Sequence, residues 1–173
     1  MRVNIGKYPG SKSKKERKIN VRIDPWDTWS VDETLAHVIV PMLTQLKAEK
    51  HGIPFTYEED APEEFKGEGP EYISHEQEGY NEARWNWILD EMIWAFTQKI
   101  DSSEASSFYH NRDQLSIGFE KIEGSTNSKV AFYYQKDLGK PPYHVDREGL
   151  KAHLDRMDNG YRLFGKYYNS LWD

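Results

Sequence analysis

NEARWNWILDEMIWAFTQKI, residues 81–100, is the stretch that decides the fold of this chain. Its apolar side chains recur every three or four positions, which is the spacing of one wide face on an α-helix. That face consists of Trp85, Ile88, Leu89, Met92, Phe96 and Ile100. We therefore expect a helix here that buries this face in the core.

Two tryptophans of the same stretch fall outside that face. Trp87 and Trp94 lie seven residues apart on the opposite arc, among polar and charged side chains. An indole is usually buried, so something is expected to cover them. One interpretation is a helix packed between two layers of this protein, and the other is a surface that meets a partner or a flat ligand.

Two further helices are expected on either side of this one. Ser30 and Glu33 have the spacing of a capping box, and an apolar stripe from Val31 to Leu46 follows, with Pro41 inside it. The last helix should begin at an Asp146 cap and carry a 4-3 seam through Gly160. The seam comprises Leu150, Leu154, Met157, Tyr161, Phe164, Tyr168 and Leu171. It suits an internal core or a homo-oligomer interface equally well.

Short strands complete the expected fold. Residues 3–8 and 19–23 are predicted as strands, and in the second the alternation of Ile19, Val21 and Ile23 with polar residues indicates one buried face. Residues 115–123 and 129–135 are predicted to form a hairpin, in which imperfect alternation suggests a bulge. The fold class is therefore α+β, with three main helices packed with a small antiparallel sheet made of the N-terminal strands and the central hairpin.

Composition and charge define the setting. The 173 residues suit a single domain over 1–173, with a basic loop at 9–18 and a long acidic loop at 53–79. Seven basic residues and one acid lie between Lys7 and Arg22, and nine acids and one cation between His51 and Gly79. The interpretations are solvated surface, phosphate attraction by the basic stretch, and recognition of a basic partner by the acidic one. The overall acidic balance argues against strong general nucleic-acid binding.

Other features concern location and chemistry. The chain has no cysteine, no apolar run of membrane-spanning length and no signal-peptide pattern, so a reducing cytoplasm is expected. It lacks a phosphate-binding glycine loop, a nucleophile elbow and an HExxH pair. Glu33 and His37 are one helical turn apart, a spacing that is common by chance, so no metal, cofactor or catalytic residue is assigned. We expect a binding protein more than an enzyme.

A binding constellation is the remaining candidate site. Aromatic rings with guanidinium and ammonium groups are suited to stacking a base and pairing a phosphate. The candidate ligand-binding residues are Arg84, Trp87, Glu91 and Trp94 on the central helix, with Arg162, Lys166 and Tyr167 near the C-terminus. Trp172 lies nearby in sequence. The alternative is structural, with Arg162 and Lys166 solvated and Trp172 docking the C-terminal segment.

Three stretches resemble a family of uncharacterised tailed-bacteriophage proteins that are frequent in marine phages. They are KINVRIDPWDTWSVDETLAHVIVPMLTQLK with the following HG, then RWNWILDEMIWAF, and finally HLDRMDNGYRLFGKYYNSLWD. They cover roughly half the chain, at both ends and in the central helix. The resemblance implies a viral protein in the cytoplasm of an infected bacterium, and it transfers no functional residue.

Three functions follow from these observations. The first is an accessory protein that antagonises a bacterial defence, either by sequestering a nucleotide-type signal or by blocking a host defence protein. The second is a virion or assembly protein that uses its charged stretches for interaction. The third is a small nucleotide-cleaving enzyme with Glu33, His37, Asp90 or His153 in its site.

Overall fold

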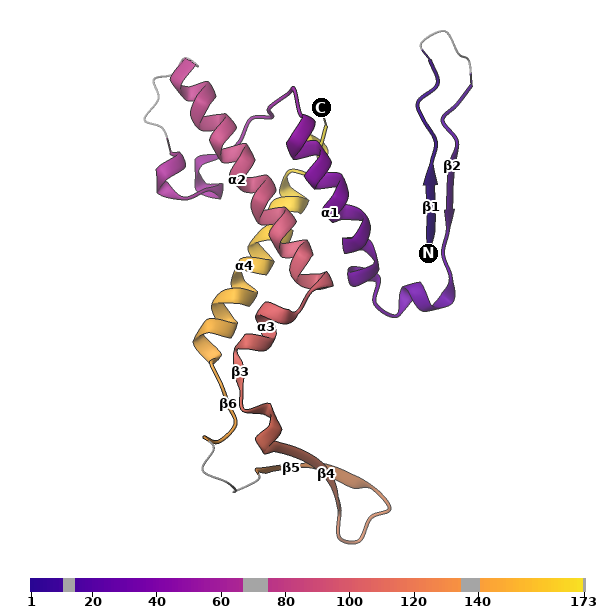
Figure 1. The fold of residues 1–173 in the computed structure, drawn as a ribbon, viewed down its shortest axis with the longest axis vertical. Helices are drawn as coiled ribbons and strands as arrows, with labels where there is room; N and C mark the ends of the chain where they lie inside the picture. Colours follow the sequence, from indigo (N-terminus) through magenta and orange to yellow (C-terminus); the bar gives the residue numbers. More distant parts are fainter. Residues whose placement is uncertain (11–14, 67–74, 135–140, 173) are drawn as a thin grey trace.

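Three helices build the body of the molecule (Figure 1). In the computed structural model, which describes residues 1–10, 15–66, 75–134 and 141–172, these are α1 (Val31–Glu49), α2 (His75–Ile100) and α4 (Arg147–Lys166). Helix α2 packs against both α1 and α4, so the central helix is enclosed by two neighbours. The predicted three-helix α+β fold is confirmed.

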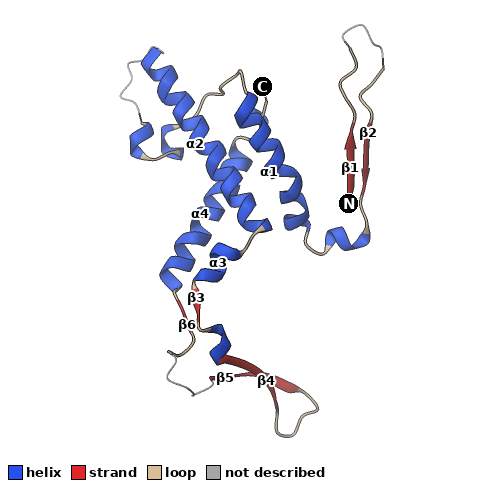
Figure 2. Ribbon diagram, viewed as in Figure 1, coloured by secondary structure: helices blue, strands red, loops and turns tan. Residues whose placement is uncertain are grey.

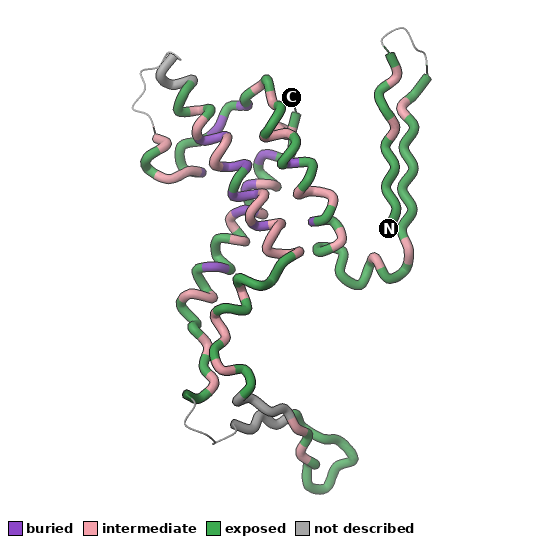
Figure 3. The backbone as a smooth tube through the Cα atoms, viewed as in Figure 1, coloured by how far each residue is buried: buried purple, intermediate pink, exposed green. Residues whose placement is uncertain are grey.

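The core lies where the three helices meet, which Figure 3 shows as the purple segments of the tube. Trp85, Ile88, Leu89 and Met92 of α2 are fully buried, as the helical spacing predicted. Leu43 of α1 and Leu163 and Tyr167 at the C-terminal end of the chain complete the buried cluster. Burial of this apolar surface is the main force that holds the bundle together.

The buried line of α4 differs from the predicted seam. The buried side of α4 consists of His153, Gly160 and Leu163, one position before the expected residues, with Tyr167 just beyond the helix. Of the seam itself, Leu154 and Tyr168 are exposed and the other five are only partly buried. The reason is Gly160, because a Cβ there would lie 2.4 Å from the Cβ of Ala95, so α4 comes close to α2 at a residue that has no side chain.

The N-terminal ends of α4 and α1 are capped in different ways. Asp146 caps α4 as expected, since its Oδ1 accepts a hydrogen bond from the Gly149 amide at 2.9 Å. Ser30 makes no such side-chain bond, so the predicted capping box is wrong. In its place a short 3₁₀ turn, Pro25–Thr28, precedes α1, and the Asp27 carboxylate accepts from the Asp24 amide at 2.8 Å. Helix α1 runs through Pro41 as one element.

The strands form three separate antiparallel pairs, as Figure 2 shows in red. Strands β1 (Arg2–Ile5) and β2 (Ile19–Arg22) make an N-terminal hairpin, which we call the arm. Strands β4 (Leu115–Lys121) and β5 (Ser128–Tyr134) make the expected central hairpin. Its register is continuous from Leu115↔Tyr134 to Lys121↔Ser128, so the suggested bulge is absent from it.

The third pair links the central hairpin to the bundle. After α2 come the short helix α3 (Ser103–Ser107) and strand β3 (Tyr109–His110), which pairs with β6 (His144–Val145) just before α4. Both hairpins stand away from the three-helix body (Figure 1).

The predicted buried face of the arm is wrong. All residues of β1 and β2 are exposed, and Ile19 and Val21 keep 63% and 54% of their surface accessible. Alternation did identify a ribbon with one apolar face, but within the described chain that face has no cover.

Candidate functional site

The seven predicted ligand residues do not converge on one site. One group surrounds residues 56–65, which follow α1 and which we call the acidic segment. This group comprises Arg84, Arg162, Lys166 and Tyr167. Glu91 and Trp94 belong to a second cluster with Arg156 of α4. Trp87 is partly buried and packs against the core.

Asp60 is the centre of the first cluster. Its side chain is 1% exposed and sits in the 3₁₀ turn Glu58–Asp60. The carboxylate accepts hydrogen bonds from the Tyr167 hydroxyl and from Arg162 Nη1, each at 2.7 Å, and Lys166 Nζ lies 2.5 Å away. One buried acid therefore engages the charged groups of two predicted ligand residues.

The protonation behaviour of this cluster follows from its geometry. Burial by itself raises the pKa of the Asp60 carboxyl, but hydrogen bonds from Lys166, Tyr167 and Arg162 outweigh burial, so the net pKa lies below its ordinary value. The same contact with Asp60 raises the pKa of Lys166. Burial also raises the pKa of the Tyr167 hydroxyl, with a contribution from the neighbouring carboxylate. At neutral pH the cluster is an anion held by two cations and a neutral phenol.

Arg84 fixes the same segment to α2. This buried guanidinium donates from Nε to Thr56 Oγ1 at 3.1 Å and from Nη1 to the Phe65 carbonyl at 2.9 Å. The Tyr57 amide donates to the Tyr167 hydroxyl at 3.0 Å, and the Lys166 ammonium lies 4.3 Å from the centre of the Tyr57 ring. The acidic segment thus occupies the place that the sequence assigned to a phosphate-bearing ligand.

These contacts revise one interpretation of the acidic stretch. One interpretation was recognition of a basic partner, and the described part of the stretch finds basic partners within the chain, in Arg84, Arg162 and Lys166. The acids at 68 and 71 of that stretch lie outside the described residues. Sequence reasoning missed Asp60 as the organising residue, because its partners are about a hundred positions away.

The second cluster lies farther along the α2–α4 contact. Glu91, also buried, accepts two hydrogen bonds from Arg156, from Nε at 3.0 Å and from Nη2 at 2.7 Å. The Arg156 guanidinium lies 3.9 Å from the centre of the Trp94 ring. The contact with Glu91 raises the pKa of Arg156. Arg156 is 48% exposed and lies four residues before Gly160 at the edge of the α2–α4 contact, and that spacing was the available signal for it.

His153 extends this cluster. Its ring is buried, 5.2 Å from the Trp94 ring and 5.5 Å from the Phe108 ring. Its Nδ1 lies 3.6 Å from a carboxylate oxygen of Glu104, which is on α3. Neither ring nitrogen has a hydrogen-bond partner in the described part of the chain. The cluster combines an ion pair with edge-to-face and tilted ring contacts and fixes α4 against α2.

The remaining sequence candidates are structural or exposed. Trp172 lies over Gly52, where an added Cβ would be 2.7 Å from the indole, so it docks the C-terminal segment on the end of α1. Glu33 and His37 are both exposed. Among the described residues, no group of three or more His, Cys, Asp or Glu side chains is arranged to hold a metal ion.

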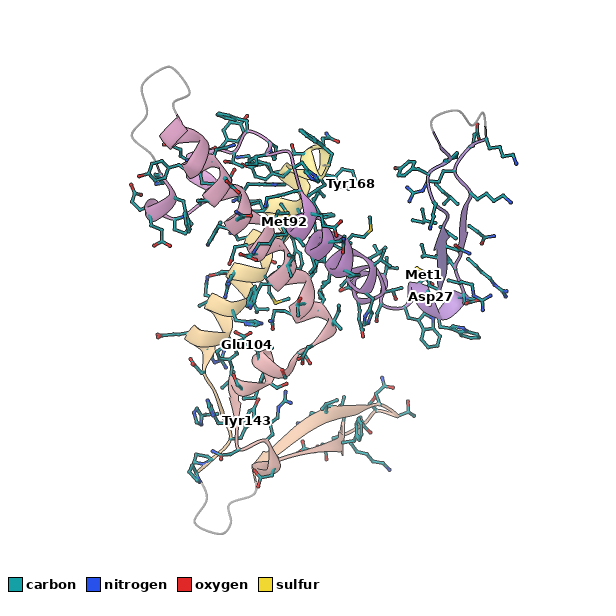
Figure 4. The ribbon with its side chains drawn as sticks, turned by 45° about the horizontal axis from the view of Figure 1, so that its top comes forward. Met1, Asp27, Met92, Glu104, Tyr143 and Tyr168 are labelled. Carbon is teal, nitrogen blue, oxygen red and sulfur yellow. The ribbon has the colours of Figure 1, made fainter. Side chains whose placement is uncertain are left out.

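The arm is the other surface with unusual chemistry. Its cross-strand neighbours place Val3, Ile5, Ile19 and Val21 on one face, which we call the apolar face. At its base Trp26 and Trp29 are 67% and 82% exposed, with their rings edge to face at 6.4 Å. Figure 4 shows the side chains of the arm spread to both sides, in contrast to Met92 inside the bundle.

Comparison of the chain with protein-family models, with characterised proteins and with solved structures finds no match. In the described chain, no helix combines the length and the apolar character needed to cross a membrane.

Proposed function

We propose that this chain is a phage-encoded accessory binding protein that blocks a host protein through its arm, and not by enclosing a nucleotide. The bare apolar face of the arm carries this proposal. A two-stranded ribbon is at best marginally stable alone in water, and exposed edge strands with apolar side chains are unfavourable unless they meet a partner. A protein surface that covers this face removes both problems.

The base of the arm adds a second kind of contact. Tryptophan is enriched among residues that dominate protein–protein binding energy, because its large ring buries much surface at a small cost in side-chain freedom. Trp26 and Trp29 lie next to the ribbon and are both largely exposed. The apolar face and these two indoles therefore suit packing against a partner's surface, with the indoles as aromatic anchors beside the ribbon.

The nucleotide alternative has weaker support. A phosphate would compete with Asp60 for Arg162 and Lys166, and that carboxylate is buried and hydrogen-bonded. Displacement would leave the acid without its cations, which is costly in a buried position. The geometry therefore favours a macromolecular partner on the arm.

The test uses neighbouring residues on opposite faces of β2. A photo-crosslinking amino acid at Val21 should attach the chain to a host protein in bacterial cells, whereas the same group at Asn20 should not. With the partner then purified, the double variant Ile19→Thr/Val21→Thr should bind at least tenfold more weakly, or about 1.4 kcal/mol. Asn20→Thr is the matched control and should bind as the parent does.

Other outcomes contradict the proposal. Crosslinks to a second copy of the chain would assign the apolar face to a homo-oligomer, and crosslinks to a capsid or tail protein would support the virion alternative. Equal partner binding by the double variant and the parent would remove the arm from the interaction.

A further inference from the structure

The opposite face of the arm has a different composition. The register of the ribbon places Arg2 opposite Arg22 and Asn4 opposite Asn20, and both pairs lie away from the apolar face. The pairing extends one step further, since the Gly6 amide donates to the Lys18 carbonyl at 2.8 Å. We call Arg2, Asn4, Lys18, Asn20 and Arg22 the cationic face.

We propose that the cationic face binds duplex DNA, with the ribbon lying in the major groove. The major groove of B-form DNA is about 12 Å wide and admits a two-stranded antiparallel ribbon. Strands about 4.8 Å apart with side chains on one face match that width. This inference is separate from the proposed protein contact, because it concerns the other face of the ribbon.

The side chains of the cationic face also suit the major groove. Arginine pairs with the O6 and N7 acceptors of guanine, and asparagine pairs with the donor and acceptor of adenine. Arginine and lysine at the groove edges also pair with phosphates. On the cationic face the Asn4–Asn20 pair lies between the Arg2–Arg22 pair at one end of the ribbon and Lys18 at the other, so base-reading groups are flanked by phosphate-binding groups.

Charge is segregated in the way this proposal requires. Residues 1–22 contain eight Lys or Arg and one acid, whereas the rest of the chain contains 15 Lys or Arg and 28 acids. Phosphates therefore attract the arm and repel the body. Contact is confined to the ribbon, which agrees with the expectation that the chain is not a strong general nucleic-acid binder.

Local contacts within the arm leave the side chains of the cationic face accessible to DNA. Arg17, on the other face, is held within the arm, since its Nε donates to the Gly6 carbonyl at 2.7 Å and its guanidinium lies 4.0 Å from the centre of the Tyr8 ring. Arg22 Nε lies 3.6 Å from an Asp24 oxygen but its side chain remains 73% exposed. A single nearby carboxylate on an exposed pair is readily exchanged for a phosphate.

The test measures binding of a fluorescein-labelled 20-base-pair DNA duplex by anisotropy as the salt concentration varies. Three cations on the face give an expected slope of log affinity against log salt of about −2.7. Replacing two of them in Arg2→Gln/Arg22→Gln should reduce the magnitude of the slope by about 1.8 and weaken binding at least tenfold at low salt. The control Arg147→Gln/Lys151→Gln makes the same charge change on α4 and should leave the slope unchanged.

Several results would overturn the proposal. The first is that the DNA duplex does not bind at 50 mM salt, and the second is that the α4 control loses as much affinity as Arg2→Gln/Arg22→Gln. The third is that an RNA duplex binds as tightly as the DNA duplex, although the major groove of RNA is too narrow for a ribbon. Far-UV circular dichroism confirms folding of each variant. Asn4→Ala/Asn20→Ala provides a second test without a charge change, and it should weaken binding while leaving the slope as it is. Ile19→Thr/Val21→Thr should bind DNA as the parent does, so loss of the protein partner and loss of DNA binding are separable.

Discussion

Gly160 is a position where α4 comes close to α2, and replacing it tests the packing of the bundle. In Gly160→Ala the new methyl group would lie 2.4 Å from the Ala95 Cβ and 2.7 Å from the Glu91 carbonyl oxygen. Comfortable carbon contacts are about 3.5–4.0 Å, so the helices must separate by roughly 1 Å. Overpacking of this kind costs about 1–3 kcal/mol, whereas alanine in a helix is favoured over glycine by about 1 kcal/mol. We expect a net destabilisation of up to about 2 kcal/mol.

Gly165 provides the matched control on the same helix. An added Cβ there meets no atom within 4 Å, so Gly165→Ala should gain up to about 1 kcal/mol from helix propensity alone. Urea unfolding followed by far-UV circular dichroism measures both variants, and the m-value should stay constant. For a chain of this size, Gly160→Ala should lower Tm by up to roughly 8 °C. If Gly160→Ala matches or exceeds Gly165→Ala in stability, the close helix contact described above is wrong.

The other predictions concern the buried groups. Asp60→Asn should destabilise the protein by about 2–3 kcal/mol, because it removes a buried charge from Arg162 and Lys166, which remain partly solvated; unchanged urea unfolding would contradict this. The pKa of Asp60 is lowered in the folded protein, so its contribution to stability is full above the unfolded-state pKa of about 4 and is lost as pH falls through the lower folded value. Unfolding free energies of parent and Asp60→Asn measured from pH 7 to pH 2 should therefore converge in acid, and a constant difference would refute the assignment. Met92→Ala should lower the free energy of unfolding by about 2–5 kcal/mol. Trp94→Ala should also destabilise the protein, because Arg156 and His153 cover the Trp94 ring. Full stability of the Trp94 variant would favour an open ligand surface instead.

Local periodicity predicted the parts of the fold that depend on local pattern. The apolar face of α2 was found correctly because Trp85, Ile88, Leu89 and Met92 are large and recur at helical spacing. The same method placed the buried side of α4 one residue off. There Gly160 makes a close contact with α2 and the buried line includes His153, and neither residue stands out in a search for large apolar side chains.

The pairing of charges was not visible from the sequence. Arg162, Lys166 and Tyr167 were identified as part of one group with ligand-binding chemistry, and the structure does bring them around one anion, while Arg84 of the same group holds the acidic segment at Thr56 and Phe65. That anion is Asp60 of the same chain. A local pattern shows which groups need an opposite charge but carries no information on which distant segment supplies it.

The arm shows a related limit. Alternation in residues 19–23 correctly indicated a strand with an apolar face. Burial of that face depends on another element reaching it, and residues of the bundle do not cover Ile19 or Val21. The pattern therefore predicted a surface that requires a cover, and the identity of the cover is the functional question.

The central claim is that the chain encloses no nucleotide, and the most direct test is to ask whether the purified protein retains one. The purified protein is incubated with a panel of nucleotide immune signals, freed of unbound ligand, and heat-denatured, and the released material is quantified by its absorbance at 260 nm after chromatography. Because Asp60 already engages Arg162 and Lys166, the account predicts that no signal is retained. Release of intact nucleotide in stoichiometric amount, abolished by Arg162→Ala, would contradict it and restore the ligand site near the C-terminus.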